Sequence, residues 1–152
     1  MKRTAFWKRQ KSAGSAGAPS DYDQWAGKFP SANLSDRNAD YDGDGQSNDN
    51  ERIWGLNPTN ALSRNPFIFN SSLKSGAFSY TRRTPALTGL SYTVWTSTNL
   101  VNWTQDTGAI QTPGIAVNQV ETVAVVLSPG LVTGPRLFIR MRAAQPLITK
   151  WK

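Results

Sequence analysis

The segment DYDGDGQSNDNE at positions 40–51 restricts the fold of this chain more than any other stretch. Asp40, Asp42 and Asp44 stand at alternate positions, so three carboxylates lie close together and repel one another unless a cation balances them. Gly45 follows directly, and glycine readily adopts the left-handed backbone conformations that a sharp turn requires. We therefore predict a tight loop with converging acidic side chains at this place, and neither a strand nor a continuous helix.

The spacing of oxygen-bearing residues in this loop suits a hard divalent cation. Calcium takes about six to eight oxygens, from alternate carboxylates, a main-chain carbonyl and a final bidentate glutamate. The residues at loop positions 1, 3, 5, 7, 9 and 12 are Asp40, Asp42, Asp44, Gln46, Asn48 and Glu51. The sequence thus predicts Ca²⁺ as the cofactor, with Gln46 contributing its main-chain carbonyl. The alternatives are a solvated acidic turn and a magnesium site. Residues close enough in sequence for a second ion or an outer shell are Asp36, Asn38 and Asp49.

Charge divides the chain into three parts. Residues 1–20 hold five basic residues and no acidic one, whereas residues 21–51 hold eight acidic and two basic residues. Residues 52–152 hold ten basic and two acidic residues, so the net charge of +7 hides an acidic middle segment. The predicted organisation is a basic flexible tail (1–19), a calcium-binding acidic module (20–60), a β-sandwich domain (61–144) and a C-terminal tail (145–152).

The chain has no histidine and no cysteine. It therefore has no Ser-His-Asp or Cys-His catalytic group, no zinc site with nitrogen or sulfur ligands, and no disulfide. The sequence also lacks phosphate-cradling glycine loops and nucleophile elbows. The paired carboxylates that acid–base catalysis would use all belong to the acidic loop. We expect a protein that is not an enzyme.

The basic residues of the first tail surround only three apolar residues, and SAGSAGAPS follows them. A secretory signal has about seven to fifteen apolar residues in a row, so no signal peptide is visible, and the composition is that of a flexible linker. No window reaches the roughly 18 apolar residues of a membrane span. We expect no nucleic-acid partner and no membrane span, and we expect the chain to be a fragment or remnant of a longer protein.

Two short helices are predicted on either side of the loop. Ser20 is a helix cap with Asp23 three residues further on, and a stripe at helical spacing follows until Pro30. The stripe consists of Tyr22, Trp25, Ala26 and Phe29. Residues 47–54 are predicted to form an exit helix that Gly55 ends. The apolar residues expected to cover the end of the following domain are Ile53, Trp54 and Leu56.

From residue 66 onward the pattern is that of an all-β domain. Apolar runs alternate with turn residues, without helical periodicity between them. The expected strands are 77–83, 90–97, 120–127 and 137–142. About six or seven strands in all favour an antiparallel β-sandwich of the fibronectin or immunoglobulin type. The predicted fold class is therefore mainly β, with a short helix–calcium loop–helix module before the sandwich.

The arginines and two tryptophans of the β region each allow two interpretations. The arginines are Arg82, Arg83, Arg136, Arg140 and Arg142. We expect them on solvated strand faces that also prevent edge pairing, and the alternative is a basic face for an acidic polysaccharide or nucleic acid. Trp95 and Trp103 are expected to complete the sandwich core, and the alternative is stacking on sugar rings.

Residues 21–58, DYDQWAGKFPSANLSDRNADYDGDGQSNDNERIWGLNP, resemble the acidic calcium-binding repeats of the thrombospondin type 3 kind, whose loops are similar to EF-hand and dockerin loops. The run FSYTRR…LSYTVWTSTNLVNWT…PRLFIRMRA is similar to the C-terminal β-sandwich accessory domain that follows such a repeat in large secreted bacterial proteins. The resemblance covers about residues 20–144. It implies that the calcium-binding residues are Asp40, Asp42, Asp44, Gln46 and Glu51. Only one full repeat is present, so cohesin binding, which needs a second loop, is not implied.

The resemblance implies a non-catalytic accessory domain of a secreted or cell-surface bacterial protein, in which calcium rigidifies the acidic module against the sandwich. An extracellular or cell-surface location also agrees with the loop, because cytosolic free calcium is too low to fill a weak site of the extracellular type. The expected partners are calcium and a polysaccharide or cell-surface glycan, and the chain is expected to be a monomer or part of a larger chain. The alternative functions are a carbohydrate-binding module and a C-terminal sorting or secretion domain.

Overall fold

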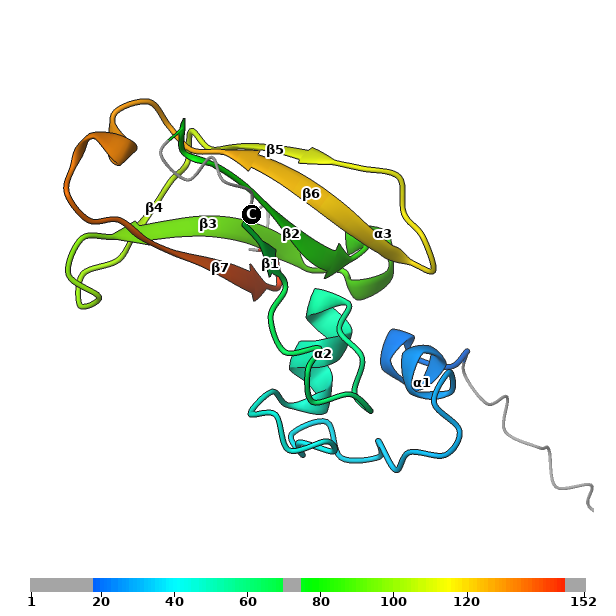
Figure 1. Ribbon diagram of the computed structural model, residues 1–152. Coiled ribbons are helices and arrows are strands. Elements are labelled where there is room, and N and C mark those ends of the chain that lie inside the picture. The colour runs from blue at the N-terminus through cyan, green and yellow to red at the C-terminus, as the bar shows by residue number, and fades with distance from the viewer. Residues whose placement is uncertain (1–17, 70–74, 147–152) are drawn as a thin grey trace, which may run out of the picture.

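The computed structural model describes residues 18–69 and 75–146 (Figure 1). Seven strands of these residues form two antiparallel sheets, and helices α1 (Asp21–Ala26) and α2 (Asn48–Trp54) lie at one end of the sheets. The prediction of a mainly β fold is confirmed, and the two sheets are compatible with a sandwich. The predicted tails lie outside the described residues, apart from residues 18–19 and 145–146. Of the described helices, none has the length and hydropathy needed to cross a bilayer.

One sheet has the strand order β1-β2-β6-β5 and the other β4-β3-β7. The strands of the first sheet are β1 (Phe67–Ile68), β2 (Ala77–Arg83), β6 (Val120–Val126) and β5 (Ile110–Pro113). Those of the second are β4 (Thr104–Gln105), β3 (Ser91–Ser97) and β7 (Phe138–Ala144). The four long strands follow the predicted runs, although β7 extends two residues past the expected end. The short α3 (Pro85–Thr88) and η2 (Leu131–Thr133) connect long strands and were not predicted.

The core lies between the two sheets, because each long strand turns alternate side chains inward. In β3, for example, Tyr92 and Val94 are buried while Ser91 is exposed. The buried core consists of Phe78, Tyr80, Tyr92, Val94, Val123, Val125, Leu127 and Met141. Both sheets contribute to this set, so they share one hydrophobic interior.

Helix α1 begins as predicted but ends early. Ser20 and Asp23 form the predicted capping box, in which each side chain accepts a hydrogen bond from the other residue's backbone N–H. The helix ends at Ala26, before the expected Phe29, because the low helix propensity of Gly27 allows the chain to leave the helix there. Phe29 nevertheless packs against Trp25, with ring centroids 5.5 Å apart. The helix buries its aromatic stripe in a small cluster of its own.

Helix α2 packs against one end of the two sheets. Ser47 caps its first turn, and Gly55 ends it in the left-handed conformation, as predicted. The indole of Trp54 packs edge-on against the rings of Tyr80 and Tyr92, with centroids 6.2 and 5.6 Å away. The hydroxyl of Thr81 donates to the carbonyl of Trp54 at 2.9 Å. The predicted covering role of Trp54 is confirmed, and Ile53 packs against the same core.

Two of the predicted solvated arginines are buried instead. Arg82 is on the buried face of β2 and donates from its Nε to Glu121 Oε1 at 2.7 Å, across the β2–β6 ladder. Arg83 is 1% exposed, because α1 and α2 lie over the end of β2 and Asp21 supplies a carboxylate. Opposite charges on neighbouring elements thus replace water around both guanidinium groups. Arg136 and Arg142 are exposed, as predicted.

The prediction that Trp95 and Trp103 complete the core is wrong. Tyr92, Val94 and Thr96 face inward, so Trp95 lies on the outer face of β3, and neither tryptophan packs in the core. Arg140 covers both indole rings there, with its guanidinium carbon 5.7 Å from the centroid of Trp95 and 4.2 Å from that of Trp103. Cation–π contacts bury part of each ring without bringing it into the interior.

Candidate metal centre

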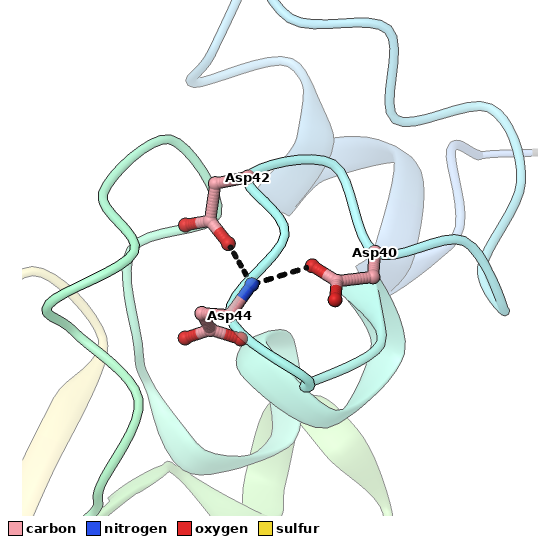
Figure 2. A group of neighbouring side chains, drawn as sticks. All are labelled: Asp40, Asp42 and Asp44. Carbon is pink, nitrogen blue, oxygen red and sulfur yellow. Dashed lines mark hydrogen bonds between the residues drawn. The ribbon is translucent and has the colours of Figure 1, made fainter.

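The structure brings the three aspartates of the acidic loop together. Asp40, Asp42 and Asp44 each place a carboxylate oxygen within 4.8 Å of those of the other two (Figure 2). Asp40 is exposed, whereas Asp42 and Asp44 are partly buried. The loop lies between α1 and α2 in the chain and leads directly into α2. The sequence predicted this convergence from the alternate spacing alone.

Backbone N–H groups of the loop fix the first aspartate. Asp40 Oδ1 accepts hydrogen bonds from the backbone of Gly43 at 2.8 Å and of Asp44 at 3.1 Å, and its Oδ2 accepts one from Gly45 at 2.8 Å. Asp44 N also donates to Asp42 Oδ1 at 3.3 Å, so a single N–H joins two carboxylates (Figure 2). Gly43 and Gly45 have φ angles of 79° and 93°, which glycine adopts without steric cost. The loop backbone therefore wraps around the carboxylate of Asp40.

Four carboxylate oxygens near the centre of the loop are buried and accept no hydrogen bond. They are Asp42 Oδ2, Asp44 Oδ2, Glu51 Oε1 and Glu51 Oε2. An ionised carboxylate offers only acceptor sites, and burying such an oxygen without a donor costs about 1–3 kcal/mol or more. A bound cation would supply the positive charge that these oxygens lack. The described residues supply no arginine or lysine to this cluster.

Glu51 is the member of this group whose two carboxylate oxygens are both buried without a hydrogen-bond donor. It lies in α2 with 0% of its surface exposed, and it ends the twelve-residue loop. Burial, with a smaller contribution from the charges of Asp42, Asp44 and Asp40, raises the pKa of its carboxyl to about 8. Glu51 is not among the carboxylates that lie within 4.8 Å of one another, but the charges of the three aspartates act on its carboxyl. A cation at the same place would reverse the effect and stabilise the ionised form.

Asn48 is fully buried and joins the two ends of the loop. Its Nδ2 donates to the carbonyl of Asp36 at 2.8 Å, and its Oδ1 accepts from the backbone of Tyr41 at 3.3 Å. Its own backbone N–H donates to the carbonyl of Ala39 at 2.8 Å. The sequence predicted Asn48 as a ligand, and its spacing gave no sign of these contacts with the preceding residues. In loops of this kind position 9 often contributes through a water, which is compatible with both side-chain bonds.

The residues considered for a second ion make other contacts. Asp49 forms an ion pair with Arg52, with Asp49 Oδ1 2.8 Å from Arg52 Nε. Asp36 Oδ1 accepts a hydrogen bond from the backbone of Asn38 at 2.9 Å, within its own turn. In residues 18–69 and 75–146 the acidic grouping suited to a metal is the trio of Asp40, Asp42 and Asp44. The backbone N–H of Gln46 donates to Asp44 Oδ1 at 2.7 Å, which fixes the main chain at loop position 7.

The donor set fits a hard cation that tolerates irregular coordination. The groups available in the loop are oxygens of carboxylates, an amide and the main chain, and the chain contains neither histidine nor cysteine. Such sets suit calcium better than magnesium, which needs near-ideal octahedral geometry and keeps several waters. Transition metals prefer imidazole or thiolate ligands. The cluster is therefore chemically suited to one calcium ion.

An ion-pair network that the sequence did not predict lies beside this loop. Asp21, the first residue of α1, accepts from Arg52 of α2 at 2.6 Å and from Arg83 of β2 at 2.8 Å. Arg52 directly follows Glu51, so the network begins one residue from the buried glutamate. The sequence indicated only that residues 21–51 are rich in acidic residues and that the residues after them are rich in basic ones. This difference in charge does not identify which acidic residue pairs with which arginine.

Comparisons with protein-family models, with curated proteins and with solved structures find no match for this chain. The resemblance to thrombospondin type 3-like repeats and to a bacterial accessory sandwich therefore stays a prediction. The case for the metal centre rests on the geometry of the loop itself.

Proposed function

We propose that residues 20–60 form a helix–loop–helix module that binds one calcium ion. The observation that carries this proposal is the set of four buried, unpartnered oxygens from Asp42, Asp44 and Glu51. Asp40 and the main-chain carbonyl of Gln46 complete the proposed ligands, with Asn48 contributing through a water. A calcium ion supplies the positive charge that these oxygens need, and it neutralises the repulsion between the acidic residues.

The proposed role of the ion is to rigidify the acidic module against the β-sandwich. Glu51 is in the same helical turn as Arg52, and two residues later Ile53 and Trp54 pack on the sandwich core. An ion held by Glu51 fixes the first turns of α2 and hence the contacts of Trp54 and Arg52. Because the ligands come together only in the folded loop, the free energy of metal binding adds to the free energy of folding.

We propose further that the chain is a non-catalytic accessory domain of a secreted or cell-surface bacterial protein. A weak calcium site of the extracellular type is filled only where calcium is abundant, which favours an extracellular location. An immunoglobulin-like sandwich is supported by the strand order. The order β1-β2-β6-β5 corresponds to strands A-B-E-D, and β3 and β7 take the places of strands C and F.

Terbium luminescence tests the calcium site. Terbium is a hard cation that replaces calcium, and its emission is sensitised by a nearby indole. Trp54 lies three residues after Glu51, so excitation of tryptophan should give saturable terbium emission that calcium displaces. Magnesium at the same concentration should displace it far less.

Matched variants locate the ion. Glu51→Gln keeps the shape of the side chain but removes its charge, and it should abolish the emission. Asp36→Asn removes a charge from the same segment outside the cluster and should leave the emission unchanged. Emission that survives Glu51→Gln, or that never appears with the parent protein, would overturn the proposal.

A further inference from the structure

A second candidate site lies on the outer face of the sheet β4-β3-β7, away from the acidic module. We call it the tryptophan–arginine face and define it by Trp95, Trp103, Arg140 and Arg142. Arg140 stands opposite Trp95 in the β3–β7 ladder. The guanidinium carbon of Arg142 lies 4.8 Å from the Trp95 ring centroid, and that of Arg140 lies 4.2 Å from the Trp103 ring centroid. Cations and indole rings therefore alternate across the face.

The charge of this face is unbalanced. Strands β3, β4 and β7 contain no acidic residue. The ion pairs found among the described residues use Arg52, Arg82 and Arg83, so Arg140 and Arg142 have no carboxylate partner there. The Nε of Arg140 is buried and makes no hydrogen bond. Guanidinium groups that lack a carboxylate partner keep N–H groups available for hydrogen bonds to a negatively charged ligand.

Contacts within the face determine which anion fits. The indole N–H of Trp95 donates to Thr93 Oγ1 at 3.0 Å, and that of Trp103 donates to the carbonyl of Leu100 at 3.1 Å. Guanidinium groups already lie over the rings, so the indoles offer little open surface on which a nucleobase could stack. Binding would come from the arginine N–H groups, together with polar side chains beside them.

Those polar side chains suit a hydroxylated ligand. Gln105 is paired with Trp95 in the β3–β4 ladder and is exposed, and Thr93 is paired with Arg142. Gln105 also lines an adjoining cleft of about 710 Å³, whose other lining groups include Asn102 and Arg136, and Asp106, whose carboxylate accepts hydrogen bonds from Ser128. Hydroxyl and amide groups next to unpaired guanidinium groups match a polymer that carries both hydroxyl and anionic groups.

We infer that the tryptophan–arginine face binds an anionic polysaccharide through Arg140 and Arg142. Carboxylate or sulfate groups of the polymer would accept the arginine hydrogen bonds, and its hydroxyl groups would contact Thr93 and Gln105. This inference does not depend on the calcium site, because none of these residues belongs to the acidic loop.

The inference is tested by measuring how the full chain binds two anionic polymers, hyaluronate, which carries carboxylates, and dextran sulfate. Neutral dextran is the uncharged comparison. The five basic residues of the tail could bind polyanions on their own, so all five are replaced by glutamine in the background protein. In that background Arg140→Gln and Arg142→Gln together should weaken binding to one or both anionic polymers by at least about tenfold. Arg64→Gln removes the same charge from an exposed residue off the face and should change binding little.

Several results would overturn the inference. The inference is wrong if neither anionic polymer binds, or if all binding is lost when the basic residues of the N-terminal tail are replaced. It is also wrong if the double variant binds as tightly as the background protein. Equal or tighter binding of oligothymidylate or polyglutamate would show that charge alone, or another class of macromolecule, is recognised. Arg142 is exposed, so Arg142→Gln alone provides the test if the double variant fails to fold. Measurements with calcium and with a chelator keep this result separate from the calcium proposal.

Discussion

Arg83 donates from its Nε to Asp21 Oδ1 at 2.8 Å, although the two residues stand 62 positions apart in the chain. The second oxygen of the same carboxylate lies 2.6 Å from Nη1 of Arg52. Asp21 therefore joins α1 to both α2 and β2. Since Arg52 and Arg83 are only 7% and 1% exposed, neither guanidinium can turn to water if this carboxylate is removed.

Replacing Asp21 by alanine should lower the free energy of unfolding by about 3 kcal/mol, because it leaves two buried guanidinium groups without their shared partner. Urea unfolding followed by tryptophan fluorescence measures the change. Asp23→Ala provides the control, since it removes an exposed capping carboxylate from the same helix and should destabilise the protein much less. Equal losses in the two variants would contradict a special role for Asp21.

Calcium should stabilise the folded protein through the acidic loop. At a free calcium concentration of 100 times Kd, the free energy of unfolding should rise by about 2.7 kcal/mol. Glu51→Gln should abolish this rise, whereas Asp36→Asn should keep it, and thermal melting with calcium or with a chelator compares them. A calcium response of the same size in Glu51→Gln would show that the ion binds elsewhere.

The pH dependence of stability without metal should reveal the buried glutamate. Burial and the neighbouring aspartate charges raise the pKa of Glu51 from 4.5 to about 8, so over this range the folded state holds a proton that the unfolded state has released. The free energy of unfolding should therefore fall as the pH rises from about 4.5 to about 8 in the presence of a chelator. Unfolding at several pH values checks this, and Glu51→Gln should show a smaller slope. Equal slopes would contradict the raised pKa.

Features set by neighbouring residues could be predicted from the sequence. The capping box of Ser20 and Asp23, the end of α2 at Gly55 and the span of β2 depend on local backbone preferences, and all three are found in the structure. The convergence of the three aspartates is local as well, because five residues of a tight loop fix it.

Features that depend on distant residues could not be predicted in this way. The burial of Arg83 depends on Asp21, which comes from helix α1, and the partner of Arg82 is Glu121, a strand residue 39 positions away. A prediction from charge alone therefore placed both arginines in solvent, whereas both are buried. The outward position of Trp95 is different, since the inward alternation of Tyr92 and Val94 already implied it. The prediction that Trp95 is in the core was wrong because it followed the hydrophobicity of the side chain and not the alternation of the strand.

The docking of α2 on the sandwich can be tested at the helix end. Gly55 has φ 69°, and a Cβ built on it would lie 2.6 Å from Cγ1 of Val120. Gly89 has nearly the same φ, 68°, but a Cβ there would meet nothing within 4 Å. Both Gly→Ala variants carry the left-handed strain of about 1–2 kcal/mol, and only Gly55→Ala adds overpacking, of about 1–3 kcal/mol.

Gly55→Ala should therefore destabilise the protein by clearly more than Gly89→Ala, as measured by urea unfolding of the two variants side by side. The truncation Val120→Ala in the Gly55→Ala background should recover part of the difference, because it removes the Cγ atoms that the new methyl group meets. Equal destabilisation by the two glycine variants would mean that the contact between Gly55 and β6 is loose, and that α2 is not held tightly on the sandwich.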